Sequence, residues 1–163
     1  MISAAAAAWN ALPVAQRWMI AGLGAAVALA NVAQPYPYLA PLQHGPTIGV
    51  ILAAPWLLRR RPLSTLAVGC VVLFLALHTL GGRYIYSYVP YDAWSRALTG
   101  VSLSDVFGWQ RNGYDRLVHF AFGALLTLPM VEVARRYEGM RSGAAGFLAF
   151  AVIGLASTLY EVF

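Results

Sequence analysis

Five stretches of about 20 mostly apolar residues constrain the fold of this chain more than any other feature of its sequence. They cover residues 14–32, 39–58, 63–81, 115–134 and 143–163. Because an α-helix rises about 1.5 Å per residue, each stretch is long enough to cross the roughly 30 Å hydrocarbon core of a bilayer. The sequence therefore predicts an all-α polytopic transmembrane helix bundle of about five spans, with residues 1–163 forming a single membrane domain.

The composition agrees with a membrane protein and excludes several other classes. Hydrophobic residues make up 60% of the chain and charged residues only 10%, whereas a soluble domain has about 25% charged residues. The net charge of +5 comes from arginines at the ends of the apolar stretches, so we expect lipids rather than nucleic acid as partners. The single cysteine, Cys70, excludes an intrachain disulfide and a cysteine-based zinc site.

The distribution of arginine predicts the orientation of the chain. Arg59–Arg61 separate the second and third stretches, and Arg135, Arg136 and Arg141 separate the fourth and fifth. Short loops rich in arginine are typical of the cytoplasmic side. We therefore expect a cytoplasmic N-terminus and an outward-facing Tyr/Trp-rich loop at residues 82–114, lying as a lid on the membrane surface.

Proline and glycine distinguish the second stretch from the others. Pro41, Pro46 and Pro55 fall within it, and proline removes backbone hydrogen bonds from a helix. The pattern predicts a kinked or partly unwound second span. His44 directly precedes Gly45 and Pro46, so we expect it in a turn at the outer surface.

Four ionisable residues are expected at one level of the bundle, at its outward end. Asp115 and His119 lie four residues apart, on one face of the fourth span. Because the helices alternate in direction, His78 ends the third span at this level, and Glu161 reaches it roughly 27 Å above the start of the fifth. Two imidazoles and two carboxylates suit zinc or iron, and a bound metal makes water a nucleophile near neutral pH. His78, His119, Asp115 and Glu161 are thus the candidate ligands of a divalent metal.

The same constellation suggests an enzyme acting on a lipid-like substrate. Asp115 and Glu161 are the candidate catalytic residues, either as metal ligands or, for one of them, as general base. Arginines near the outward end can hold a phosphate or carboxylate. The candidate substrate-binding residues are Arg83, Tyr84, Tyr88, Arg111, Asn112, Tyr114 and Arg116.

A purely structural interpretation of these residues is equally open. Asp115 can cap the fourth span and complement its dipole. His78 and His119 can hydrogen-bond between helices, and Glu161 can pair with an arginine. Glu132, near the inner end of the fourth span, is expected to pair with Arg135 or Arg136.

Three motifs follow one another in the second half of the chain. They are His78-Thr-Leu-Gly-Gly-Arg83-Tyr84 followed by Tyr86, Tyr88 and Pro90, then Arg111-Asn112-Gly-Tyr114-Asp115-Arg116-Leu-Val-His119-Phe120, and then Tyr160-Glu161. Their order and spacing over residues 70–163 are similar to the YjdF-like family of bacterial inner-membrane proteins, and more loosely to VanZ-like proteins. The resemblance implies a compact multi-helix protein of the bacterial inner membrane. Members of such families commonly continue past the Tyr-Glu motif with a further helix.

Three classes of function remain open at this point. The first is metal-dependent hydrolysis or modification of a lipid-like substrate. The second is a noncatalytic accessory or scaffold subunit in a homo-oligomer or a larger membrane complex, for which small-residue faces such as 22–26 and 143–146 permit close helix contact. The third is a small transporter, although five spans without an inverted repeat fit that class poorly.

Overall fold

The computed structural model describes the backbone of residues 3–162 and the side chains of residues 3–159. Throughout that part of the chain every regular element is an α-helix, which confirms the predicted all-α class. The long helices are α2 (Val14–Ala30), α3 (Ala40–Arg60), α4 (Thr65–Arg83), α7 (Tyr114–Tyr137) and α8 (Ser142–Val162); the short ones are α1 (Ala4–Asn10), α5 (Tyr91–Thr99) and α6 (Leu103–Phe107).

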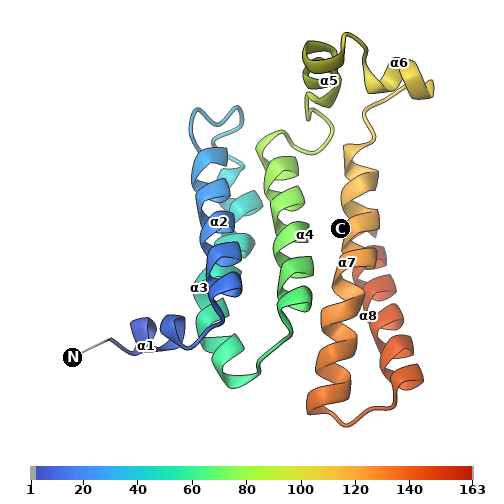
Figure 1. Ribbon diagram of the computed structural model, residues 1–163. Coiled ribbons are helices and arrows are strands. Elements are labelled where there is room, and N and C mark those ends of the chain that lie inside the picture. Colours follow the sequence, from blue (N-terminus) through green and yellow to red (C-terminus); the bar gives the residue numbers. More distant parts are fainter. Residues whose placement is uncertain (1–2, 163) are drawn as a thin grey trace.

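Helix α4 lies at the centre of the bundle (Figure 1). It packs against α2 and α3 on one side and against α7 on the other, and α8 packs against α7. Helix α2 faces the bundle with a stripe of buried residues spaced three or four apart, which is the spacing of one helix face. The stripe consists of Gln16, Ile20, Leu23, Val27 and Ala30.

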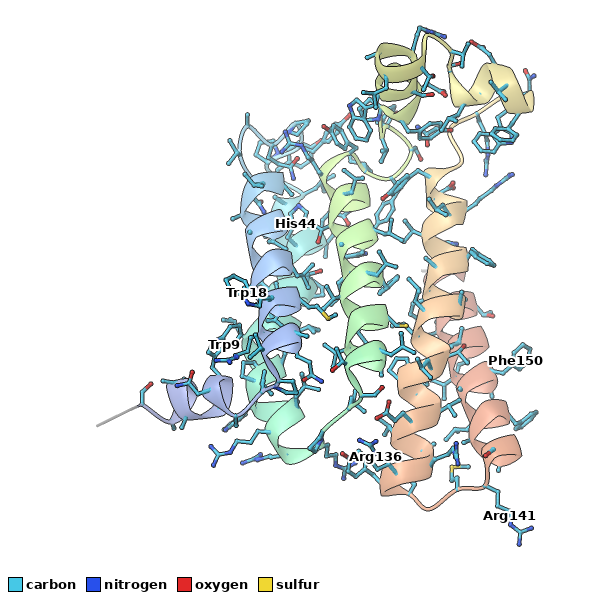
Figure 2. The ribbon with its side chains drawn as sticks, in the orientation of Figure 1. Trp9, Trp18, His44, Arg136, Arg141 and Phe150 are labelled. Atoms are coloured by element: carbon cyan, nitrogen blue, oxygen red, sulfur yellow. The ribbon has the colours of Figure 1, made fainter. Side chains whose placement is uncertain are left out.

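Helices α7 and α8 meet through small side chains. On α8, Ala145 and Ala149 are at most 1% exposed, and on α7 a Cβ added to Gly123 would lie 3.8 Å from Ile153 of α8. Small residues let two helix backbones approach closely within a bilayer, where apolar surface alone gives little drive for helix association. Phe147 and Phe150 of α8 are exposed instead, and Figure 2 shows Phe150 pointing away from the bundle, where lipid would surround it.

Not every long helix has the character of a membrane span. By length and composition α4, α7 and residues 142–159 of α8 can each cross a membrane alone, and α1 with α2 qualifies only as a pair bent by 118°. Helix α2 has 17 residues, and α3 contains three prolines and ends in two arginines. Among the described residues three or four spans are therefore supported, and the count of five stays a prediction.

The prediction that the second span is partly unwound is wrong. Helix α3 runs without interruption through Pro46 and Pro55, since each proline removes only one backbone N–H and the remaining hydrogen bonds persist. His44 is not in a surface turn either, because it lies within α3 and is 1% exposed (Figure 2). A Cβ on Gly82 of α4 would come within 3.3 Å of the His44 ring, so this glycine leaves room for the buried imidazole.

The turns 61–64 and 138–141 form one end of the bundle, which we call the arginine-rich end. There the Glu132 carboxylate accepts hydrogen bonds from Ser64 N at 2.7 Å and Ser64 Oγ at 2.6 Å, and pairs with Arg136 Nη1 at 3.1 Å. The expected pairing with Arg136 is thus confirmed. Arg136 Nη1 and Tyr137 Oη also donate to Pro62 O, at 2.7 and 2.6 Å. These hydrogen bonds connect the start of α4 to the end of α7.

The opposite end, which we call the loop end, holds α5 and α6 (Figure 1). The two short helices are joined by Asp92, whose carboxylate accepts from Ser104 N at 2.9 Å and from Ser104 Oγ at 2.6 Å. Arg96 adds an ion pair with Asp105 at 3.1 Å. The Tyr/Trp-rich loop therefore contains two short helices that are held to each other by polar contacts.

The contacts at the arginine-rich end predict a specific loss of stability. In Glu132→Ala, Ser64 and Arg136 lose their acceptor, and the free energy of unfolding should fall by about 2 kcal/mol. Equilibrium unfolding of the protein in detergent micelles measures this. The matched control is Glu138→Ala: its carboxylate is 57% exposed and pairs only loosely, at 3.5 Å, with Arg61, so the change should be below about 0.5 kcal/mol. Equal effects would contradict the role given to Glu132.

Candidate functional site

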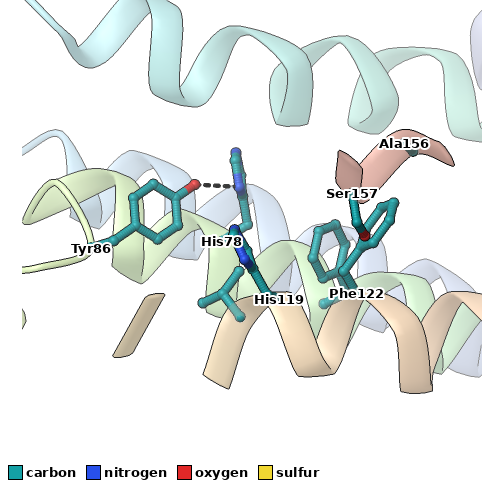
Figure 3. A pocket seen from close by; sticks show the side chains of 8 residues that line it. His78, Tyr86, His119, Phe122, Ala156 and Ser157 are labelled. Atoms are coloured by element: carbon teal, nitrogen blue, oxygen red, sulfur yellow. Dashed lines mark hydrogen bonds between the residues drawn. The ribbon is translucent and has the colours of Figure 1, made fainter. Parts of the chain in front are cut away.

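A cavity of about 300 Å³ lies between α4, α7, α8 and the turn that follows α4 (Figure 3). We call it the site cavity. Its apolar walls are Phe74, Val118, Phe122 and Ala156, and its polar members are His78, Tyr86, His119 and Ser157. The two histidines that the sequence placed at one level therefore line one cavity.

His78 makes a hydrogen bond through each of its ring nitrogens. Its Nε2 lies 3.1 Å from Gln43 O on α3, and its Nδ1 lies 2.6 Å from Tyr86 Oη (Figure 3). A carbonyl oxygen can only accept, so the neutral ring carries its hydrogen on Nε2. Nδ1 then accepts from the Tyr86 hydroxyl. His78 links α3, α4 and the loop end in this way.

Tyr86 reaches this position because the chain reverses sharply after α4. Ile85 and Tyr86 both adopt a left-handed backbone conformation, with φ of 48° and 53°, which non-glycine residues rarely do. Tyr86 N donates to Gly81 O at 2.7 Å, and the Tyr86 ring covers Gly81 so closely that a Cβ there would lie 2.5 Å from it. Backbone strain of this kind is often found at functional sites.

Two of the four predicted metal ligands come together, and the others are placed differently or not described. Asp115 is absent from the cavity wall; its carboxylate lies 3.8 Å from Arg111 and accepts from Arg116 N at 2.7 Å. The Glu161 side chain lies outside the described residues. Among the side chains that are described, no three His, Cys, Asp or Glu residues are grouped so as to hold a metal ion.

Three predicted substrate-binding residues, at the end of α4 and in the turn after it, make contacts outside the site cavity. Arg83 donates to the carbonyl oxygens of Ala30, Val32 and Ala33 and so caps the end of α2. The Tyr84 ring packs edge-on against Trp94 at 6.0 Å between ring centroids. Tyr88 is 65% exposed. Arg83 therefore stabilises the end of α2, and Tyr84 packs against the loop end.

The predicted residues at the start of α7 hold the loop end to the bundle. Asn112 Nδ2 donates to Val89 O at 2.8 Å, and Asn112 Oδ1 accepts from Tyr114 N at 3.0 Å. Tyr114, 6% exposed, donates its hydroxyl to Leu77 O at 3.0 Å. Arg111 and Arg116 are exposed beside Asp115. None of these side chains lines the site cavity.

The sequence did not single out Tyr86 and Ser157 as site residues, although both line the cavity. For Tyr86 a signal was present: Gly81-Gly82 ends the third apolar stretch, and consecutive glycines permit close approach of a large side chain. Ser157 lies in an apolar helix without a local motif, so only its position on α8 opposite α7 identifies it.

Comparisons with known proteins agree with these observations. Residues 15–163 match a family described as a predicted membrane protein, DUF2238. The chain is 32% identical over 107 residues to the inner membrane protein YjdF of Escherichia coli (strain K12), a match that covers 64% of this chain and 46% of that protein. The chain thus spans about half the length of this relative. No solved structure matches. The YjdF-like resemblance is confirmed, and the VanZ-like one stays a prediction.

The packing of Tyr86 on Gly81 predicts a stability difference between two glycines. Gly81→Ala forces the Tyr86 ring away from α4 and from His78, and should lower the free energy of unfolding by about 2 kcal/mol. Gly22→Ala on α2 is the control, because a Cβ there meets nothing within 4 Å; it should be neutral or stabilise by up to about 1 kcal/mol. Unfolding in detergent micelles compares the two. If Gly81→Ala is as stable as the control, Tyr86 does not occupy this position.

Proposed function

Because the chain belongs to the DUF2238 family of membrane proteins, we propose that it modifies a lipid-like molecule by general acid–base chemistry in the site cavity. One observation supports this most strongly. Four polar side chains from α4, the following turn, α7 and α8 line a single cavity whose other walls are apolar. Ionisable groups at membrane depth are costly and commonly functional, and such a mixed cavity suits an acyl chain with a polar head.

The chemistry assigned to these residues is hydrolysis of an ester bond. His119 accepts a proton from water, the water oxygen forms a bond to the carbonyl carbon or phosphorus, and the bond to the leaving oxygen breaks. The proton that His119 took from the water then passes to that leaving oxygen, and Tyr86, whose own hydrogen is donated to His78, accepts a hydrogen bond from the attacking water and orients it. The role of His78 is to accept the Tyr86 hydrogen bond at Nδ1, which positions the phenol.

This assignment gives His78 a different role from the metal ligation that was expected from the sequence. To bind a metal, His78 would have to give up its bond to Tyr86 or to Gln43 O, since both ring nitrogens are engaged. Its contacts support positioning of Tyr86 rather than metal ligation. The donor set that remains for zinc or iron is His119 with Glu161, and this set is part of the test below.

The arrangement also supports a proposed orientation. Arg59–Arg61, Arg135, Arg136 and Arg141 all belong to the arginine-rich end, where Arg136 and Arg141 lie in Figure 2. The positive-inside rule then places this end and the N-terminus in the cytoplasm. The site cavity, nearer the loop end, would open toward the outer leaflet of a bacterial inner membrane.

Lipid turnover by reconstituted protein tests the proposal. Purified protein is incorporated into vesicles of total Escherichia coli lipid, and the products are identified by mass spectrometry. His119→Gln and Tyr86→Phe should each lower product formation by about 100-fold or more. Tyr38→Phe, an exposed tyrosine of the turn before α3, is the matched control and should retain activity.

Two results would contradict the proposal. One is the absence of any lipid product from the wild-type protein, which would favour a noncatalytic accessory subunit. The other is full activity of both variants. Metal analysis of the same protein, purified without chelator, supplies a further check: stoichiometric zinc or iron that is lost in His119→Gln would replace acid–base catalysis by metal-assisted hydrolysis.

A further inference from the structure

Helices α3 and α4 are close together at the loop end. A Cβ on Gly82 of α4 would lie 3.0 Å from Gln43 Cβ of α3, so the helices nearly touch there. His44 and Thr47 of α3 are also buried, at 1% and 0% exposure. Over the rest of α3, residues 48–60, no side chain is buried.

A groove of about 440 Å³, which we call the α3 groove, lies between α2, α3 and α4, and Val133 of α7 also lines it. Its walls are apolar and include Leu23 of α2, Ala54 and Leu58 of α3, and Val72 of α4. At its mouth, at the arginine-rich end, are Arg60 and Arg61. It shares no lining residue with the site cavity.

The length of the α3 groove corresponds to one leaflet of a membrane. From Arg60 to Val50, the lining residue of α3 farthest from the mouth, is a rise of roughly 15 Å along the helix. This is half of the roughly 30 Å hydrocarbon thickness. Farther along α3 toward the loop end, Gln43 and His44 lie against Gly82 of α4. A partner helix crossing the whole membrane does not fit such a space, whereas one acyl chain does.

The charge at the mouth identifies the head group. Arg60 and Arg61 are exposed, and the Arg60 guanidinium lies 4.6 Å from the centre of the Trp56 ring, at a depth where tryptophan commonly marks the membrane interface. Glu132 is engaged by Ser64 and Arg136. Glu138 is 3.5 Å from Arg61, but both side chains are more than half exposed, and such pairs are weak. The mouth therefore keeps a surplus of positive charge.

We propose that the α3 groove binds one anionic phospholipid of the leaflet at the arginine-rich end. An acyl chain lies between α2, α3 and α4, and the phosphate accepts hydrogen bonds from Arg60 and Arg61. Arginine suits this role because its planar guanidinium can donate two parallel bonds to a phosphate. Basic pockets between membrane helices on the cytoplasmic side commonly bind anionic lipids. This site goes beyond the proposed reaction and does not depend on it.

Native mass spectrometry of the full chain from detergent micelles tests the inference with two probes, dioleoyl phosphatidylglycerol and dioleoyl phosphatidylcholine. The wild type should bind one phosphatidylglycerol about tenfold more tightly than phosphatidylcholine. Arg60→Gln/Arg61→Gln should lower phosphatidylglycerol affinity by about tenfold or more. Ala54→Trp, which fills the groove and leaves its charges intact, should lower it similarly. Circular dichroism confirms that each variant remains helical.

The matched control is Arg59→Gln/Arg135→Gln. It removes the same charge from the same end, at two exposed arginines that do not line the groove, and should stay within about threefold of the wild type. Equal loss in this control would overturn the site in favour of general charge attraction. Full binding by Ala54→Trp, equal affinity for the two lipids, or a lipid-free dimer would each overturn it as well.

Discussion

The structure depends on a requirement that the bilayer places on polar groups: each one that enters it needs a partner within the protein. At both ends of the bundle, residues of α4 or of its cap supply hydrogen-bond partners for polar groups of the neighbouring helices. At the arginine-rich end its capping residue Ser64 donates twice to Glu132 of α7. At the loop end Arg83 caps the carbonyl groups of α2, and His78 donates to Gln43 O of α3. The apolar faces of the helices pack together. The polar bonds connect α4 to α2, α3 and α7.

The site cavity follows from the same requirement. The His78 nitrogen that does not face α3 needs a donor, and Tyr86 supplies its hydroxyl at 2.6 Å. The chain brings Tyr86 there through two left-handed residues and a ring seated on Gly81. A positioned phenol then faces His119 of α7 and Ser157 of α8 across one cavity. A bond between His78 and Tyr86 thus also brings polar side chains of α4, the following turn, α7 and α8 to the wall of one cavity.

Hydropathy was sufficient to predict the long helices, because a 20-residue apolar stretch has few alternatives to a helix. The third stretch, expected at 63–81, is helical at 65–83, and alternation of the helices correctly placed His78 and His119 on one level. The sequence did not predict that Tyr86 lines the cavity, because the position of this side chain depends on rare backbone angles at Ile85 and Tyr86 itself. The burial of His44 and the capping of α2 by Arg83 depend on contacts between segments that are distant in the sequence. The hydrophobic periodicity of one segment does not reveal such contacts.

The most direct test of this account is the protonation state of His78 in the intact protein. Nitrogen-15 NMR of histidine-labelled protein in lipid nanodiscs, with the His78 signal assigned by its loss in His78→Gln, reports which ring nitrogen carries hydrogen. The account predicts a neutral ring protonated at Nε2, with an Nδ1 shift that changes in Tyr86→Phe. A ring protonated at Nδ1, or a spectrum unchanged by Tyr86→Phe, would contradict it.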